Sequence, residues 1–400
     1  YTEATAAPSN RSMSEESKAQ YLDNSNYNPE DYNNQNDVMP ATGADNGVQL
    51  VDLRGLDYED ELWDTLLDEL TVDEMSNLIA FGGYQTAAID SIGKVATTDC
   101  DGPVDIYNNF TGVSSIGLPA VVMLAFTWNT DIAQEYGECI ASMADEMNVS
   151  GWYAPSMNMH RNSFAGRNFE YYSEDGFIAG KLAASVVQGS NKYGVYAYIK
   201  HFALNDQETN RCAFLLTYSN EQAIREIYLK PFELCIKNFD GTQIAVMSSF
   251  NWIGTVPACA NEDTLTTILR NEWGFQGMVI TDYDGSYGYM ITDHCVRTGN
   301  DLMLGFSSQA SNQLTNTESA TLNNALRTSC KNIMYTIANS GYYTNTTDDS
   351  GMSNMTKLFV TIDVVTVLLV VLCMALVIVR YRKKHAKTAA EVTPEEKKEE

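Results

Sequence analysis

The sequence predicts an α/β protein, a complete or irregular (β/α)8 TIM-like barrel followed by a single transmembrane helix. Short apolar runs of strand length alternate with amphipathic stretches of helix length over most of the chain. Repeated strand-helix units form parallel sheets with right-handed crossovers, and such a sheet can close into a barrel. Near the C-terminus, residues 359–379 are a 21-residue apolar run in which Asp363 is the one charged residue. A helix of that length spans the ~30 Å of membrane hydrocarbon.

Residues 1–50 are rich in Asn, Ser, Asp and Tyr and poor in aliphatic residues. Such a segment buries too little apolar surface to fold alone, so we expect a disordered linker. The chain begins at Tyr1 without a signal peptide. We therefore expect a piece of a longer protein, with a further domain upstream.

The barrel domain is predicted over residues 51–343. Apolar positions in 60–70 follow helical spacing, and Thr71 with Glu74 forms a capping box that opens the next helix. The continuous apolar run Leu118–Ala125 is expected to be a strand. Further strands are expected at 150–155, 195–200, 243–249, 277–281 and 301–304, and helices at 131–148, 177–190, 219–238, 263–271, 287–298 and 318–339. Fewer than eight strands are clear, which leaves an irregular barrel open.

Polar side chains follow directly on the buried strand Val195–Ile199. Lys200 and His201 stand at its C-terminal end and open the stretch KHFALNDQETNR, which ends at Arg211. Ligands bind at this end of the strands in α/β barrels, so these residues indicate a site for a polar substrate. A solvated strand-to-helix loop with an incidental His is the alternative that the residues alone leave open.

Four segments resemble signature segments of glycoside hydrolase family 3, the β-glucosidase and β-xylosidase relatives, and occur in the family's order. They are Asp101–Pro103 (DGP), Gly166–Asp175 (GRNFEYYSED), Lys200–Arg211 and Trp273–Asp282 (WGFQGMVITD). The resemblance implies a retaining, exo-acting β-glycosidase that hydrolyses β-linked oligosaccharides or glycosides. It implies no cofactor and no metal.

The resemblance also assigns residues. Asp282 ends the strand 277–281 and corresponds to the nucleophile, whereas Asp284 before Gly285 is the competitor and is better explained as a turn residue. Glu208 and Arg211 could instead orient Lys200 and His201. Structural roles are expected for Asp99, His160, Arg161, Glu170 and Glu174. The residues implied to bind the sugar are Asp101, Arg167, Lys200, His201, Arg211, Met247 and Tyr283.

The chain departs from the family's pattern at several positions. Phe250 replaces a Tyr that many relatives have, and Tyr283 replaces a frequent Trp. The stretch Ala203–Asn205 replaces the loop that carries a catalytic His in the N-acetylglucosaminidase branch, which favours a β-glucosidase or β-xylosidase type.

The acid/base residue is a second point of departure. In β-glucosidase-like members it lies on a second domain that usually follows the barrel, whereas here the residues after Gly351 are a spacer, the span and a tail. We therefore expect the acid/base on the upstream domain, in permuted order. The alternative function is a surface carbohydrate-binding protein that has lost catalysis.

Composition limits the partners and the compartment. The net charge of −27 argues against binding of nucleic acid, whose phosphates would be repelled. The eight cysteines form no C-x-x-C pair, so neither a zinc site nor a dense disulfide framework is expected. Basic residues from Arg380 to Lys387 follow the span, predicted as 358–380 after a polar spacer (344–357). The positive-inside rule then predicts a cell-membrane protein with its barrel outside and its tail, 381–400, in the cytoplasm.

Overall fold

The computed structural model describes residues 12–212, 214–239, 241–285, 287–306, 314, 316–344 and 354–391, the side chains of the last segment only for 360–383. The chain forms two compact units, Tyr1–Thr347 and Asp348–Glu400. Most of the predicted polar spacer and the end of the predicted tail lie outside the described residues.

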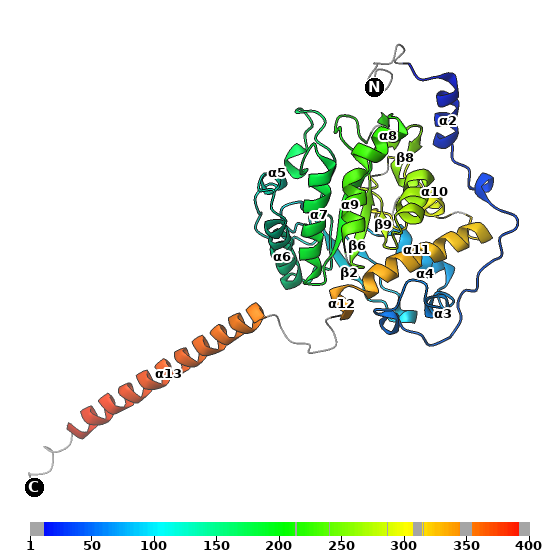
Figure 1. Cartoon of the computed structure of the whole chain (residues 1–400). Coiled ribbons are helices and arrows are strands. Elements are labelled where there is room, and N and C mark those ends of the chain that lie inside the picture. The colour runs from blue at the N-terminus through cyan, green and yellow to red at the C-terminus, as the bar shows by residue number, and fades with distance from the viewer. Residues whose placement is uncertain are drawn as a thin grey trace, which may run out of the picture. The chain divides into compact units, whose positions relative to one another are not determined.

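The first unit is built on a six-stranded sheet with the order β1-β2-β3-β4-β6-β9 (Figure 1). From β2 to β9 all neighbours are parallel, whereas β1 pairs with β2 in antiparallel orientation. The strands are β1 (Gln85–Thr86), β2 (Thr97–Cys100), β3 (Gly151–Trp152), β4 (Tyr196–Phe202), β6 (Ile244–Ser248) and β9 (Val279–Ile280).

Backbone hydrogen bonds continue the sheet beyond β9. Leu302 forms a parallel bridge with Ile280. The Met303 N–H donates to the Ile79 carbonyl oxygen, and the Gly82 N–H donates to the Met303 carbonyl oxygen, each at 2.9 Å. The segment after Asp301 thereby connects β9 to the chain that leads into β1. The predicted parallel strand-helix order is confirmed, whereas a complete (β/α)8 barrel is not shown, since the described part of the chain has six strands in this sheet.

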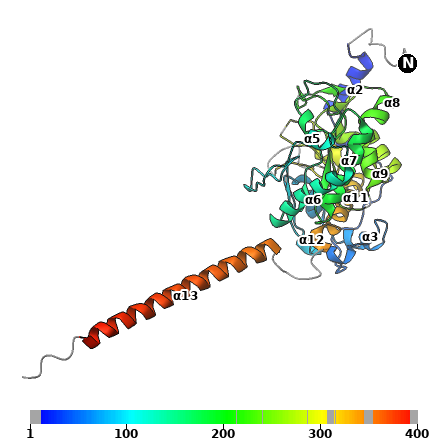
Figure 2. The same ribbon diagram turned by 60° about the vertical axis from the view of Figure 1, so that its left-hand side comes forward.

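Both faces of the sheet are buried, which explains the continuous apolar runs. Alternate residues of β4 enter two different clusters, Ala197 and Ile199 one, Tyr196 and Tyr198 the other. Figures 1 and 2 show helices packed around the strands. The first cluster includes residues of α6 (Thr130–Glu146), α7 (Gly176–Asn191) and α9 (Lys230–Asn238), and the second includes residues of α3 (Leu62–Leu67), α4 (Val72–Ala80) and α11 (Ala320–Ala338).

Local sequence features explain how two of these helices begin and pack. The predicted capping box is confirmed: Thr71 Oγ1 accepts the Glu74 N–H at 3.2 Å, and the Glu74 carboxylate accepts the Thr71 N–H at 2.9 Å. Helices α6 and α7 approach closely at Gly189, where an added Cβ would lie 2.1 Å from the Gln134 carbonyl oxygen. Glycine is therefore required at this crossing.

Several predicted elements differ from the structure. The run Leu118–Ala125 contains the helix α5 (Val121–Ala125) and is not a strand. Its buried residues Val121, Leu124 and Ala125 follow helical spacing, which a continuous apolar run does not reveal.

The other helices after β4 are α8 (Glu221–Ala223), the π-helices η5 (Ile224–Tyr228) and η7 (Asp263–Glu272), and α10 (Thr292–Thr298), which begins five residues later than predicted. Short turns complete the list: η1 (Pro29–Tyr32), η2 (Leu50–Leu53), η3 (Asp90–Ile92), η4 (Asn168–Glu170), η6 (Ala258–Ala260) and α12 (Gly341–Thr344).

The N-terminal segment corrects the prediction of a disordered linker for residues 12–50. It forms the helix α2 (Glu15–Ser25) and packs on the domain. The Asn24 amide donates to the Thr255 carbonyl oxygen at 3.1 Å, and the Tyr27 ring stacks on His294 at 4.4 Å. Half-buried tyrosines supply the apolar contacts of this segment, which is poor in aliphatic residues.

A second, three-stranded sheet has the order β5-β7-β8. It consists of β5 (Leu216–Thr217), β7 (Trp252–Ile253) and β8 (Val256–Pro257). These strands lie in the connections that follow β4 and β6, and therefore at the C-terminal ends of the main strands.

The second unit contains the helix α13 (Asn354–Glu391). Among the described residues it is the one helix that is long and apolar enough to cross a membrane, with a candidate span at Val360–Lys383 and a mean hydropathy of 3.1. This finding rests on length and composition, so the cellular location stays a prediction.

All eight cysteines are free thiols, five of them buried.

Candidate active site

Asp282 lies two residues beyond β9, at the C-terminal edge of the main sheet. Its Oδ1 accepts the Tyr283 N–H at 2.7 Å. Its Oδ2 is buried and has no hydrogen-bond partner within the part of the chain that the structure describes. This oxygen lies 4.0 Å from the Arg211 guanidinium and 3.9 Å from His201 Nε2. The side chain is 11% exposed, whereas Asp284 is fully buried and its N–H donates to the Leu304 carbonyl oxygen.

The charge state of Asp282 is set by two opposing effects. Burial raises the pKa of the Asp282 carboxyl above its ordinary value. The guanidinium groups of Arg211 and Arg167 oppose this increase, as do the Tyr283 N–H and the Lys200 ammonium. The cations therefore keep the carboxylate ionised at a lower pH than burial alone would allow.

His201 is held in one orientation by Asn158. The Asn158 amide nitrogen donates to the His201 carbonyl oxygen at 2.8 Å, which identifies the other amide atom as Oδ1. That oxygen accepts the His201 backbone N–H at 2.8 Å and lies 3.2 Å from the ring Nδ1. A neutral ring with its proton on Nδ1 then presents the Nε2 lone pair toward Asp282. Nothing in the sequence pattern had indicated Asn158.

The ring of His201 is neutral for an electrostatic reason. Burial lowers the pKa of His201 well below its ordinary value. The nearby positive charges of Arg167, Lys200 and Arg211 lower it further. The imidazole therefore accepts a hydrogen bond at Nε2 and adds no charge to the site.

Lys200 on β4 and Asp101, which directly follows β2, form an ion pair across β3. The buried Lys200 ammonium donates to Asp101 Oδ1 at 2.7 Å. Partial burial would raise the pKa of Asp101, but the Lys200 charge and hydrogen bond hold it below its ordinary value. The Asp101 side chain is 42% exposed. An ionised carboxylate is therefore available at the surface to accept hydroxyl groups.

Arg167 and Arg211 are joined through carboxylates. Glu208 Oε2 lies 3.0 Å from Arg211 Nε, and Glu208 Oε1 lies 4.0 Å from Arg167. Glu170 accepts a hydrogen bond from the Arg167 Nε–H. The Arg211 guanidinium lies 4.6 Å from the Phe250 ring centroid, and one of its NH groups is buried without a partner among the described residues. Glu208 thus orients the arginines rather than Lys200 and His201, which corrects that alternative.

Met247 and Tyr283 are the remaining predicted sugar contacts. Met247 is 3% exposed on β6 and packs in the cluster that contains Ile280. Tyr283 is 39% exposed and its ring centroid lies 6.3 Å from that of Phe306. The contacts of both residues with a sugar stay predictions.

Asp99 and His160, two of the residues with expected structural roles, are engaged in internal hydrogen bonds. Asp99 accepts the hydroxyl groups of Tyr196 and Tyr198 at 2.6 and 2.8 Å, and burial raises its pKa to about 6. His160 Nε2 lies within 2.9 Å of two backbone carbonyl oxygens. These residues hold the scaffold and do not reach the Asp282 carboxylate.

The cluster combines acceptors and donors in one place. Ionised carboxylates and a neutral imidazole accept hydrogen bonds, and an ammonium and two guanidinium groups donate them. Such a mixed array suits a neutral ligand with several hydroxyl groups. Among the described residues, no group of three or more His, Cys, Asp or Glu side chains could hold a metal ion.

Comparison with known proteins decides the family. The model of the family described as Glycosyl hydrolase family 3 N terminal domain matches residues 102–310, more than half of the chain. The chain belongs to glycoside hydrolase family 3.

Relatives of known sequence in the family are named as β-glucosidases. Beta-glucosidase A of Butyrivibrio fibrisolvens is 39% identical over 232 residues, which cover 58% of this chain and 27% of the relative. Beta-glucosidase B of Emericella nidulans is 38% identical over 227 residues, or 56% of this chain and 26% of the relative. The chain thus spans about a quarter of the length of these relatives.

Solved structures of family 3 proteins share the fold. Beta-glucosidase 3B from Thermotoga neapolitana in complex with α-D-glucose matches with a TM-score of 0.63 and 29% identity, over 73% of this chain and 45% of that protein. Beta-glucosidase from Kluyveromyces marxianus in complex with glucose matches with a TM-score of 0.62 and 29% identity, over 69% of this chain and 33% of that protein.

Proposed function

We propose that this family 3 chain carries the catalytic domain of a retaining, exo-acting β-glycosidase of the β-glucosidase or β-xylosidase type. The observation that carries the proposal is the buried Oδ2 atom of Asp282, which has no hydrogen-bond partner among the described residues. Buried polar atoms are rarely unpaired, so such an atom at the C-terminal edge of a sheet is available to a ligand. The names of the related β-glucosidases support the same reaction class.

In the proposed first step, Asp282 Oδ2 attacks the anomeric carbon of a terminal β-linked sugar. A bond forms between this oxygen and the carbon, the glycosidic bond breaks, and the leaving oxygen takes a proton from an acid. Water then attacks the same carbon and releases the sugar and the carboxylate, with net retention. The Arg211 guanidinium at 4.0 Å favours the ionised nucleophile before attack.

Residues around Asp282 would orient the sugar. Its hydroxyl groups can donate to Asp101 and to His201 Nε2, and they can accept from Lys200 and from the unpaired NH of Arg211. Charge-assisted bonds of this kind select for both position and orientation of the ring.

We place the acid/base residue on another domain. The carboxylates described around the Asp282 cluster, at Asp101, Glu170 and Glu208, are each bonded to Lys200 or to an arginine and serve as acceptors. General acid assistance contributes about 10²–10⁴-fold. This chain alone should therefore cleave aryl glycosides with activated leaving groups far better than it cleaves cellobiose.

We further propose that α13 anchors the protein in the cell membrane with the barrel outside. The 24-residue candidate span and its basic C-terminal flank support this orientation. A barrel outside the cell would meet neutral β-linked saccharides there.

The test of the activity is to trap the glycosyl-enzyme intermediate. A dinitrophenyl 2-fluoro-β-glucoside should label the peptide that contains Asp282, and Asp282→Asn should abolish the label. The matched control Asp284→Asn should keep it. Labelling at Asp284 would contradict the assignment, and saturable sugar binding without any label would favour the alternative of a carbohydrate-binding protein.

A further inference from the structure

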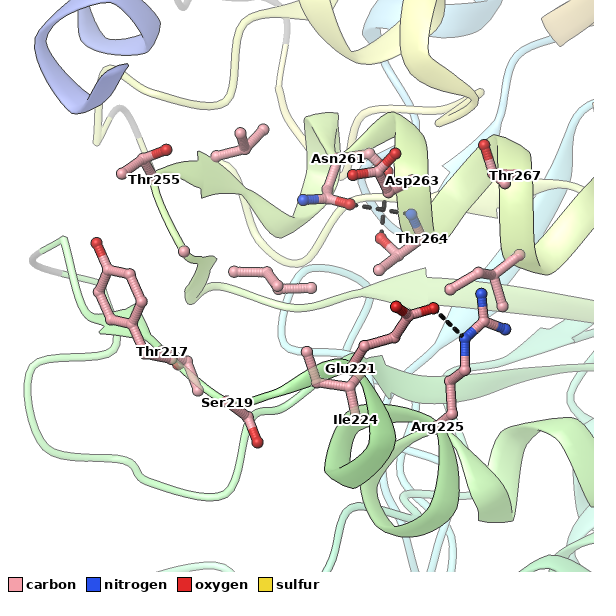
Figure 3. A pocket seen from close by; sticks show the side chains of 15 residues that line it. Thr217, Ser219, Glu221, Ile224, Arg225, Thr255, Asn261, Asp263, Thr264 and Thr267 are labelled. Atoms are coloured by element: carbon pink, nitrogen blue, oxygen red, sulfur yellow. Dashed lines mark hydrogen bonds and ion pairs between the residues drawn. The ribbon is translucent and has the colours of Figure 1, made fainter. Parts of the chain in front are cut away.

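A cavity lies beside the small sheet β5-β7-β8, outside the cluster around Asp282. Its volume is about 580 Å³, and it is an open pocket lined by this sheet, by α8 with η5, and by η7 (Figure 3). Pockets that hold small molecules usually have ~300–1,000 Å³. The cavity is therefore large enough for one.

The small sheet separates this cavity from the aromatic cluster beneath Arg211. Trp252 packs in that cluster with Phe250, whereas the next residue, Ile253, lines the cavity. On β5, Leu216 packs against the cluster and Thr217 lines the cavity. Successive side chains of a strand point to opposite faces of a sheet. One face of the small sheet therefore contacts the aromatic cluster that supports Arg211, and the other face lines the cavity.

The polar lining excludes a strongly anionic ligand. Glu221 accepts a bond from Arg225 at 2.9 Å, and Arg225 also donates to Glu272 at 2.7 Å. The guanidinium charge is thereby neutralised. Asp263 is exposed and forms no ion pair in the described part of the chain, so the lining favours neither phosphate nor sulfate.

The lining instead combines hydrogen-bonding groups with apolar surface. Figure 3 shows Asn261, Asp263 and Thr264 on one side of the cavity and Glu221 and Arg225 on the other. The hydroxyl, amide and carboxylate groups suit a ligand with several hydroxyl groups. The apolar part of the lining suits the C–H faces of a sugar ring and is formed by Ile224, Ile253, Val256 and Ile268.

We propose that this cavity is an accessory binding site for one pyranose unit, distinct from the site at Asp282. The unit is either free monosaccharide product or the end of an oligosaccharide, because both present the same ring and hydroxyl groups. The choice of a pyranose among neutral polyols rests on the proposed function. The presence of a binding site is argued separately, from the volume and the lining of the cavity.

The test follows isoleucine methyl groups by NMR in the full chain held in detergent micelles. Glucose and cellotriose are titrated separately into an Asp282→Asn variant, which does not cleave the oligosaccharide. We expect saturable shifts of the Ile253 and Ile268 δ1-methyl signals, which line the cavity, and none of Ile333, which is buried in α11. Saturation by glucose identifies the product as ligand, and saturation by cellotriose alone identifies the oligosaccharide end; either supports the site.

Two variants link the shifts to the cavity. Thr267→Trp fills it from the exposed lining residue Thr267 and should abolish the shifts. Asp263→Ala removes a charged acceptor and should weaken binding about tenfold. Glu262→Ala is the matched control, because this exposed neighbour loses the same charge but lies outside the lining. It should leave the affinity unchanged.

The proposal is overturned if neither sugar gives a saturable shift of the two cavity methyl groups. Shifts that persist unchanged in Thr267→Trp, or an equal loss in Asp263→Ala and Glu262→Ala, would also overturn it. Failure of the trapping experiment at Asp282 together with saturable shifts would refute the glycosidase and support the cavity as a saccharide site.

Discussion

Replacing Arg211 by Met removes the cation that most strongly opposes the effect of burial on Asp282. The proposed nucleophile acts in its ionised form. Loss of the guanidinium raises the pKa of Asp282 further, so a larger share of the enzyme is protonated and inactive at low pH. We expect the acidic limb of the pH profile to move to higher pH.

The distance between the charges sets the size of the effect. At 4.0 Å and an effective dielectric constant of ~20, the attraction between the two charges is ~4 kcal/mol. Arg211 is 27% exposed and shares its charge with Glu208 at 3.0 Å, so we take about half of this value or less. A loss of ~1.5–2 kcal/mol changes the ionisation equilibrium by ~10–30-fold.

The assay is the pH dependence of kcat/KM for a dinitrophenyl β-glucoside, which reports ionisation of the free enzyme. Loss of the proposed sugar contact lowers the activity of Arg211→Met at every pH. On the acidic limb the variant should lose a further ~10–30-fold relative to the wild type, and this further difference should shrink as the pH rises. A carbon-13 NMR titration of the labelled Asp282 carboxyl provides a reading that does not depend on turnover.

Arg211→Lys is the control, because it keeps a positive charge near Asp282 and should leave the acidic limb close to its wild-type position. If Arg211→Met lost the same factor at every pH, Arg211 would be a sugar ligand only. Superimposable carboxyl titrations in the wild type and in Arg211→Met would refute the electrostatic reasoning.

Three further predictions concern the hydrogen bonds from Asn158 to His201, the packing of α6 against α7, and the membrane topology. Asn158→Leu removes the partner that orients His201, so it should raise the KM for aryl β-glucosides ~10-fold with a smaller effect on kcat. A fall in kcat alone would contradict the role of Asn158 in orienting His201. Gly189→Ala places a methyl group 2.1 Å from a carbonyl oxygen of α6 and should lower the free energy of unfolding by ~1–3 kcal/mol. Gly117→Ala, with its first neighbour at 4.0 Å, should be neutral or stabilising by up to ~1 kcal/mol, and equal effects in urea unfolding would refute the packing argument. Protease added to intact cells should remove the part before 360–383 and spare the tail, whereas full-length chain in the soluble cytosolic fraction would argue against the anchor.

Much of the candidate site could be predicted from the sequence because parallel strands end at one edge. Lys200 and His201 follow the apolar run of β4 in the sequence, and the structure includes both in the last residues of that strand. Asp282 follows β9. The structure brings both ends together, with His201 Nε2 3.9 Å from Asp282. Strand period and strand order are local or nearly local properties, so they can be inferred from apolar runs.

The sequence analysis missed two elements, the helix α5 and the packed segment of α2. Their local sequence patterns fit more than one structure, and tertiary contacts decide which one forms. The run Leu118–Ala125 is continuously apolar, so its pattern fits a strand as well as a helix. The structure forms a helix that buries Val121, Leu124 and Ala125. The composition of the α2 segment is typical of a linker, but in the structure Tyr21 packs on Trp252 with their ring centroids 5.3 Å apart. In both cases the deciding contacts come from residues far away in the chain.

The sequence by itself determined the class of fold, the positions of the chemical groups at the strand ends and the apolar length of α13. Only the tertiary structure decided that Asn158 orients His201, that Glu208 joins the two arginines, and that Asp282 keeps one buried oxygen without a partner. The cavity beside β5-β7-β8 is also a tertiary property. Each of these features needs side chains from separate elements at hydrogen-bond or van der Waals distance, and no spacing along the chain encodes that distance.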